Sequence, residues 1–215
     1  MFKWLLLAVV AVLSAIGVSV IVNRRIPPPD FVSIKQLPAY QDPTLISRAW
    51  SLAEARHFHD PIRSQSNPSA CGPTSIANIA SATPEDVASH GKGCINGFCF
   101  GGLTLEQLAA ATRETQPTWK VETVHPADVE ALRSELRRAD QTLVVNFDRF
   151  PLFGMGGGHH SPIGVYLEAE DLAFVLDVNK SFGPWLVPTE RLFEALNTLD
   201  SSSGEKRGLI RIRNN

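Results

Sequence analysis

The sequence has little net charge, and that scarcity excludes some classes of partner. Its 215 residues carry 20 Lys and Arg against 22 Asp and Glu, which gives a formal net charge of -2. This balance produces no long-range field that would favour nucleic acid or an anionic membrane surface. The sequence also has no internal repeat and no low-complexity tract. With 44% hydrophobic residues, the composition predicts one globular domain together with appendages.

Cysteine is scarce as well, with only Cys71, Cys94 and Cys99 in the whole chain. An odd number leaves at least one thiol free if the other two pair. Cys94 and Cys99 bracket a short loop that a disulfide can close, and three reduced thiols are the alternative. If the disulfide forms, the free thiol is that of Cys71.

Motifs for metals and phosphates are also lacking. The spacing Cys-x4-Cys has no second matching pair, and no His-Glu-x-x-His is present, so the cysteines and histidines fit no zinc pattern. The glycines at residues 156–158 are followed by no Gly-Lys-Ser/Thr and by no helix start, which excludes a phosphate cradle. We therefore predict no metal site and no cofactor.

One long hydrophobic run stands near the amino terminus. Residues 4–22 carry no charge and are just long enough, as a helix, to span a hydrocarbon core of about 30 Å. A secretory signal peptide has a shorter apolar region and a cleavage site, so we favour an uncleaved membrane anchor. We assign residues 1–22 to this segment, residues 23–44 to a Pro-containing tether and residues 45–215 to the folded domain. A disulfide would place that domain on the periplasmic or extracytoplasmic side.

Within the folded domain, predicted helices come first and predicted strands follow. Apolar spacing and capping residues predict helices near residues 46–55, 75–82, 104–112, 126–139 and 189–199, with a short one starting at residue 83. Apolar and β-branched runs predict strands at residues 142–147, 161–167, 172–178 and 208–212, of which the second and third form a hairpin. This order is typical of an α+β fold with an antiparallel sheet.

Cys71 is the candidate nucleophile. It stands just before Pro73, which we expect in the first turn of a helix, where unpaired N–H groups favour negative charge. A thiol is a strong nucleophile only as the thiolate, and the polar, Gly- and Pro-containing surroundings set this cysteine apart from a structural one. Gln65 lies six residues earlier. We expect its amide and the backbone N–H of Cys71 to stabilise an oxyanion.

Two adjacent histidines, His159 and His160, are candidates for the base. If the predicted hairpin opposes Asp177 to Ser161, then His159 lies diagonally adjacent to Asp177 on the same face. His160 would point to the other face. We therefore predict a site in which Cys71 is the nucleophile, His159 the base and Asp177 the carboxylate that orients the base.

These segments resemble those of the phytochelatin synthase family. Residues 65–77 (QSNPSACGPTSIA) resemble its nucleophile segment, residues 157–164 (GGHHSPIG) its Gly-Gly-His-x-Ser-Pro segment, and residues 176–178 its Leu-Asp-Val strand. Further matches lie at Trp185 and at residues 145–147, 192–198 and 206–208. The resemblance therefore covers roughly residues 45–213, nearly all of the predicted domain.

The resemblance implies a papain-like cysteine protease fold, with the nucleophile at a helix N-terminus packed on an antiparallel sheet that carries the histidine and the aspartate. It implies that Cys71 cleaves the Cys–Gly bond of glutathione and leaves a γ-glutamylcysteinyl thioester, which water or a second glutathione resolves. His159 would shuttle protons, Asp177 would orient it and Gln65 would hold the oxyanion.

The resemblance also implies substrate contacts. Asn146, Gly158 and Arg207 would contact the γ-glutamylcysteine moiety, and the guanidinium of Arg207 suits a substrate carboxylate. A divalent heavy-metal ion would enter only as a thiolate complex of the substrate. The segment after Asp177 is one residue shorter than in the family, and we find no Cys-rich extension like that of the plant enzymes. We therefore favour hydrolysis of glutathione or its S-conjugates over the metal-activated polymerisation that serves metal detoxification.

Two other functions stay open at this point. One is a different papain-like peptidase that removes leader peptides, and the other is a membrane-tethered binding module without catalysis. The oligomeric state is open as well, and a dimer is compatible with the sequence.

Overall fold

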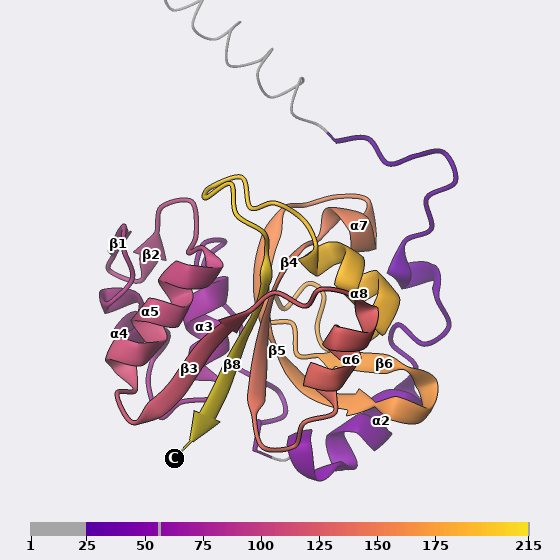
Figure 1. Cartoon of the computed structure of the whole chain (residues 1–215), viewed down its shortest axis with the longest axis horizontal. Coiled ribbons are helices and arrows are strands. Elements are labelled where there is room, and N and C mark those ends of the chain that lie inside the picture. Colours follow the sequence, from indigo (N-terminus) through magenta and orange to yellow (C-terminus); the bar gives the residue numbers. More distant parts are fainter. Residues whose placement is uncertain (1–24, 56, 215) are drawn as a thin grey trace, which may run out of the picture. The chain divides into compact units, whose positions relative to one another are not determined.

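The computed structural model describes residues 25–55 and 57–214. The predicted membrane segment, residues 4–22, lies outside the described residues; within them, we find no helix of the length and hydropathy needed to cross a membrane. The chain divides into two units, Met1–Phe31 and Val32–Asn215, and the second contains all the elements that follow (Figure 1).

A six-stranded antiparallel sheet forms the centre of this unit, with the strand order β3-β8-β4-β5-β6-β7. The bounds of its strands are Trp119–Val124 (β3), Thr142–Asp148 (β4), Gly158–Leu167 (β5), Leu172–Val175 (β6), Trp185–Pro188 (β7) and Gly208–Asn214 (β8). A separate hairpin consists of β1 (Cys94–Ile95) and β2 (Phe98–Cys99).

Helices cover both faces of the sheet (Figure 1). The α-helices are α2 (Pro43–Ser51), α3 (Cys71–Ala77), α4 (Pro84–Ser89), α5 (Leu105–Thr115), α6 (Val129–Leu136), α7 (Phe150–Phe153) and α8 (Thr189–Leu196). Three short 3-10 helices are η1 (Ile34–Gln36), η2 (Ala53–Ala55) and η3 (Glu168–Glu170). One face packs against α6, α7 and α8, and the other against α3, α4 and α5 at one end and α2 at the other.

The side chains of β4 point alternately to the two faces of the sheet and contribute to the hydrophobic core on each face. Leu143, Val145 and Phe147 are buried under α6 to α8, whereas Val144 is buried under the helices of the opposite face. Because successive side chains of a strand point to opposite faces, a strand in the middle of a covered sheet needs apolar residues at nearly every position. The run at residues 142–147, predicted as a buried strand, is confirmed.

The start signals read from the sequence are confirmed at two helices. Thr83 and Thr104 each accept a hydrogen bond from the backbone N–H three residues on. The side chains of Asp86 and Gln107 in turn accept one from the backbone N–H of the cap residue, which completes two capping boxes. The predicted hairpin is also confirmed, with η3 in its connection, and β5 pairs Ile163 with Val175. Extended by two residues, that register opposes Ser161 to Asp177, as expected.

Other boundaries differ from expectation. β3 and β7, the two edge strands, escaped prediction because β3 carries polar and charged residues and β7 is only four residues long and ends in Pro188. The helix expected at residues 75–82 ends at Ala77, since the Asn78 side chain bonds to the carbonyls of Thr74 and Arg63. The segment expected as a tether, residues 23–44, is shorter, because Ile34 and Tyr40 are buried in the core of the second unit. These apolar residues show no periodicity along the sequence, so the pattern did not predict their burial.

Gly208 is expected to matter for stability because β3 approaches it closely. A Cβ at this position would lie 2.4 Å from the Val124 carbonyl oxygen and 3.0 Å from His125 Nδ1. We predict that Gly208→Ala lowers the free energy of unfolding by ~1–3 kcal/mol in urea titrations. The control Gly157→Ala, where a Cβ would meet nothing within 4 Å, should stay within about 0.5 kcal/mol. Equal losses in the two variants would contradict this account of the fit.

Candidate active site

Cys71 is the first residue of α3 and is the free cysteine among the residues described. It is 6% exposed and lies on the wall of a cleft of about 340 Å³. The cleft is lined by Pro68, Ser69, Cys71, Phe98, Gly101, Gly102, Leu103, Gly158, His160, Asp200, Ser201, Ser202 and Arg207. The nucleophile predicted from the sequence is therefore accessible from one side and enclosed on the others.

The predicted base and carboxylate lie together behind Cys71. His159 Nε2 is 3.0 Å from Asp177 Oδ1, which leaves the Nδ1 atom of the ring as the one able to exchange a proton with a thiol. Burial alone would lower the pKa of His159, but the charges of the Cys71 thiolate and Asp177 and their hydrogen bonds raise it. The arrangement therefore favours an imidazolium at His159.

The pKa of the Cys71 thiol is shifted in the opposite direction, downward. Burial alone would raise its pKa, but the charge of His159 and hydrogen bonds to His159 and His160 hold the pKa well below the usual range of a thiol. A thiolate beside an imidazolium is the reactive form of a cysteine nucleophile. The buried cluster is thus arranged for nucleophilic attack near neutral pH.

Asp177 lies just beyond β6 and is 1% exposed, and several hydrogen-bond donors compensate its negative charge. Besides the contact with His159, it accepts hydrogen bonds from Arg149 Nη2 at 2.9 and 2.8 Å, Trp185 Nε1 at 2.9 Å and the backbone N–H of Asn179 at 2.9 Å. Burial raises the pKa of the carboxyl, but the His159 hydrogen bond and the charges of His159 and Arg149 outweigh burial and lower it. The carboxylate therefore stays charged and fixed.

Arg149 is a site residue that the sequence reasoning missed. Its guanidinium carbon lies 3.8 Å from the centroid of the Phe182 ring and 5.6 Å from those of Phe147 and Phe153. An arginine on aromatic faces is stabilised by cation–π attraction, which helps to hold the charge beside Asp177. No local motif marks this residue, because it meets Asp177 from a distant part of the chain, the turn between β4 and α7.

The sequence predicted only that His160 points to the other face of the strand from His159, and the structure adds that its ring reaches Cys71. Its Nδ1 atom lies 3.9 Å from Cys71 Sγ, and its Nε2 atom lies 2.7 Å from Asn146 Nδ2. At this end β5 pairs only with β4, since pairing with β6 starts at Ile163. Alternation along the strand therefore predicts the face to which each histidine side chain points. It does not predict that Cys71 lies close to both histidines at the start of β5, where β6 is not yet paired with it.

The expected substrate-contacting residues surround one guanidinium. Arg207 Nη1 donates to Asn146 Oδ1 at 2.8 Å and to Asp200 Oδ2 at 2.9 Å. The guanidinium also lies against Gly158, where a Cβ would be 2.5 Å from Nη1, so a larger residue would displace the guanidinium. Asn146 is fully buried, with its Oδ1 atom against Arg207 and its Nδ2 atom against His160, and its contact with substrate stays a prediction.

Gln65 is held beside the strand segment that carries Asp177. Its backbone N–H donates to the Val178 carbonyl at 2.8 Å, and its Nε2 donates to the Asn67 carbonyl at 2.8 Å. One amide hydrogen of Gln65 is left for another acceptor. Its role at an oxyanion stays a prediction.

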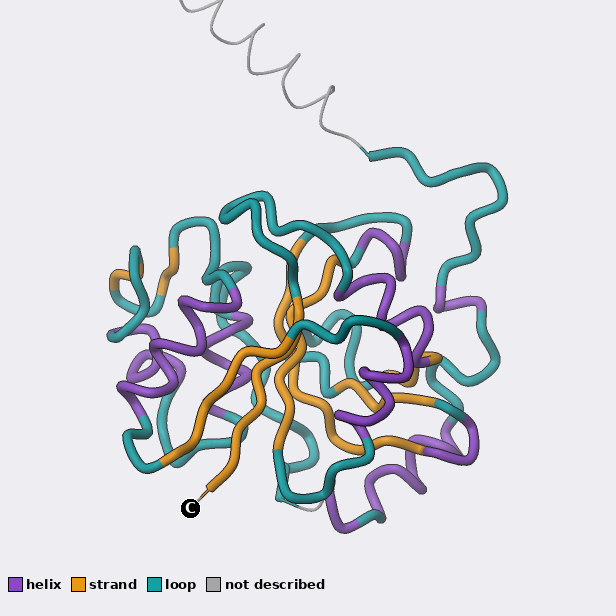
Figure 2. The backbone as a smooth tube through the Cα atoms, in the orientation of Figure 1, coloured by secondary structure: helices purple, strands orange, loops and turns teal. Residues whose placement is uncertain are grey.

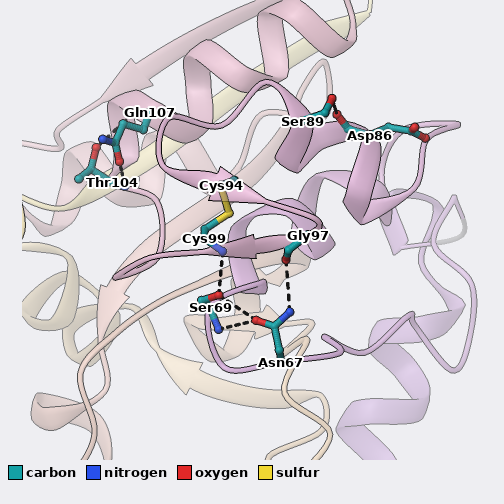
Figure 3. The surroundings of a disulfide bond; sticks show 9 residues. All are labelled: Asn67, Ser69, Asp86, Ser89, Cys94, Gly97, Cys99, Thr104 and Gln107. Atoms are coloured by element: carbon teal, nitrogen blue, oxygen red, sulfur yellow. Dashed lines mark hydrogen bonds between the residues drawn. A yellow bond between two sulfur atoms is a disulfide. The ribbon is translucent and has the colours of Figure 1, made fainter.

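A disulfide joins Cys94 to Cys99 and steadies the loop before the nucleophile (Figure 3). Asn67 Nδ2 donates to the Gly97 carbonyl at 3.3 Å, and the Cys99 N–H donates to Ser69 Oγ at 3.0 Å. Ser69 Oγ in turn donates to Asn67 Oδ1 at 2.8 Å. As Figure 2 shows, this approach to α3 is a loop, so these bonds replace the order that a helix or strand would supply.

A metal centre is not evident at the site. Across residues 25–55 and 57–214, no three His, Cys, Asp or Glu side chains converge as ligands would. The two paired cysteines are engaged in the disulfide, and the two histidines of β5 are engaged with polar side chains.

Comparison with known proteins gives a consistent result. The family model described as Phytochelatin synthase matches residues 36–209. Glutathione gamma-glutamylcysteinyltransferase 1 of Triticum aestivum is 31% identical over 169 residues, which cover 69% of this chain and 33% of the relative. Glutathione gamma-glutamylcysteinyltransferase 3 of Lotus japonicus is 28% identical over 177 residues, covering 69% of this chain and 35% of the relative. The chain thus spans about a third of the length of these curated relatives.

A solved structure supports the fold. The peptidase domain of Streptococcus ComA, a bi-functional ABC transporter involved in a quorum-sensing pathway, matches with a TM-score of 0.50 at 14% identity. The match covers 73% of this chain and 100% of that domain. The α+β, papain-like fold expected from the sequence is confirmed.

The depressed pKa of Cys71 predicts how its alkylation depends on pH. Iodoacetamide reacts with the thiolate, so the rate for the native protein should change little between about pH 8 and about pH 6. The same protein unfolded in urea should lose about ten-fold in rate per pH unit over that range, because an ordinary thiol protonates there. A native rate that falls with the same slope as the unfolded control would contradict the thiolate assignment.

Proposed function

The chain belongs to the phytochelatin synthase family, and from that premise we propose that it cleaves the Cys–Gly bond of glutathione or of its S-conjugates. The observation that carries the proposal is the buried Cys71 thiolate beside His159, in a cleft whose wall contains the guanidinium of Arg207. The names of the curated relatives, glutathione gamma-glutamylcysteinyltransferases, support a γ-glutamylcysteinyl group as the one transferred.

In the acylation step, the Cys71 thiolate attacks the carbonyl carbon of the cysteinyl residue. The carbonyl oxygen becomes an oxyanion, which the backbone N–H of Cys71 and the free amide hydrogen of Gln65 stabilise. The His159 imidazolium then gives its proton to the glycine nitrogen as the C–N bond breaks. Glycine leaves, and the γ-glutamylcysteinyl group remains on Cys71 as a thioester.

In the deacylation step, neutral His159 removes a proton from the acceptor. A water molecule then attacks the thioester and releases γ-glutamylcysteine, or the amino group of a second glutathione attacks and lengthens the peptide. Sulfur leaves as the thiolate, and the imidazolium beside it restores the starting pair. Asp177 holds the ring in one orientation and stabilises its positive charge in both steps.

Two charged side chains of the cleft suit the γ-glutamyl end of the substrate. This end carries a carboxylate and an ammonium on one carbon. The Arg207 guanidinium suits the carboxylate, and the Asp200 carboxylate, 8% exposed, suits the ammonium. Gly158 has no side chain and so leaves room for that guanidinium beside β5. A divalent heavy-metal ion enters only as the thiolate complex of a substrate.

Two features support a proposal for the location of the protein. We propose that residues 4–22 anchor it in a membrane, with the catalytic domain on the periplasmic or extracytoplasmic side. The Cys94–Cys99 disulfide supports an oxidising compartment. Protease added to intact cells tests this placement, since an extracytoplasmic domain is accessible and a cytoplasmic one is protected.

Glycine release from glutathione tests the proposed activity. The protein is expected to release glycine, and Cys71→Ala should lower the rate by at least about 10³-fold because no thioester can form. The control His59→Ala changes an exposed histidine outside the cleft and should leave the rate unchanged. The second product shows which acceptor was used, since water gives γ-glutamylcysteine and a second glutathione gives the longer peptide.

Two results would overturn the proposal. Cleavage of a leader peptide without glycine release from glutathione would favour the leader peptidase. Absence of turnover with either substrate, together with retained binding, would favour a module without catalysis.

A further inference from the structure

A second chain of buried polar side chains reaches Cys71, on the side away from Asp177. It runs from Asp200 to Arg207, from Arg207 to Asn146, from Asn146 to His160 and from His160 to the sulfur. His160 is 2% exposed and Asn146 is fully buried. Buried polar groups are costly unless their partners are well placed, so a chain of this length fixes the orientation of each member.

The direction of each hydrogen bond follows from the arginine. A guanidinium has donors and no acceptor, so the Asn146 atom 2.8 Å from Arg207 Nη1 is the oxygen Oδ1. The other end of the amide is therefore Nδ2, which also has only donors, and it lies 2.7 Å from His160 Nε2. His160 Nε2 must accept that hydrogen bond, so the ring carries its proton on Nδ1.

The protonated nitrogen of His160 faces the nucleophile, since Nδ1 lies 3.9 Å from Cys71 Sγ. A ring of this tautomer donates to the sulfur and has no lone pair there with which to take the thiol proton. A second proton on Nε2 would set an N–H of the ring against the N–H groups of Asn146. We infer that His160 is a fixed, neutral hydrogen-bond donor to the Cys71 sulfur, and that proton transfer belongs to His159 alone.

This donor acts whenever the sulfur carries negative charge. That is the case in the resting thiolate and again when sulfur leaves during deacylation, where a stabilised thiolate leaves faster. Asn146 does not touch the reacting atoms and is a positioning residue that sets the tautomer of His160. The inference rests on the role proposed for Cys71 and not on the identity of the substrate.

Several charged and titratable groups around the Cys71 sulfur contribute to the pKa that a pH-dependent alkylation measurement reports. His159 and His160 face the sulfur from β5, and Asp177, paired with Arg149, contacts His159 on the side away from the sulfur. Arg207 and Asp200 stand behind His160. A matched pair of substitutions at one position is therefore needed to isolate the donor.

Nitrogen NMR of the full protein labelled with 15N-histidine tests the tautomer directly. The chain has 6 histidines, and the signals lost in His160→Asn identify those of His160. We expect one protonated nitrogen, Nδ1, and one unprotonated nitrogen, Nε2, at pH values where His159 carries both protons. In Asn146→Asp an acceptor replaces the donor, and the His160 proton should move to Nε2. An Nε2–H tautomer or a doubly protonated ring in the native protein would overturn the inference.

The donor itself is tested by alkylation of Cys71 in two variants. Asn at position 160 places an amide N–H near the site of Nδ1, whereas Phe keeps a ring and removes the donor. We expect His160→Phe to move the acidic limb of the rate profile upward by about one pH unit, and His160→Asn to restore most of that shift. Equal profiles for Phe and native protein, or equal shifts in the two variants, would overturn the inference.

The results separate this inference from the proposed function. An Nδ1–H tautomer without glycine release from glutathione would reject the substrate and keep the donor. Normal glycine release with an Nε2–H tautomer would reject the donor and keep the substrate.

Discussion

Asp177 keeps a negative charge where water does not reach, and the rest of the site depends on how that charge is compensated. The carboxylate accepts hydrogen bonds from Arg149 and Trp185 and lies 3.0 Å from His159 Nε2. Removing one partner of a buried ion pair costs about 3–5 kcal/mol, because the other charge is left without compensation. Arg149 therefore lets Asp177 stay ionised and still orient His159, and the oriented imidazolium in turn keeps Cys71 as a thiolate.

The nucleophile lies between two adjacent histidines with different partners. The carboxylate behind His159 favours an imidazolium, which suits proton transfer. The amide behind His160 presents a donor to Nε2, which suits a neutral ring that donates through Nδ1. The two neighbouring histidines thus differ in chemistry because the hydrogen-bond partner of one ring nitrogen sets the protonation of the other.

Local signals in the sequence predicted the features that local physics decides. The capping residues Thr83 and Thr104 marked helix starts, and the hairpin register brought His159 to Asp177. Features that depend on partners distant in the sequence were not predicted. Arg149 reaches Asp177 from the turn between β4 and α7, and His160 meets Cys71 at the start of β5, before its pairing with β6 begins. The edge strands were missed for local reasons, since β3 is mostly part-exposed and carries charged residues, whereas β7 is only four residues long and ends in Pro188.

The central claim is that Cys71 carries the γ-glutamylcysteinyl group between the two halves of the reaction. Mixing the protein with glutathione, quenching with acid and mapping the peptides by mass spectrometry tests it most directly. The account predicts a γ-glutamylcysteinyl thioester on the peptide that contains Cys71 and on no other peptide, formed as glycine appears. Glycine release with the acyl group on a different residue, or with no acyl group on the protein at any time in the reaction, would contradict it.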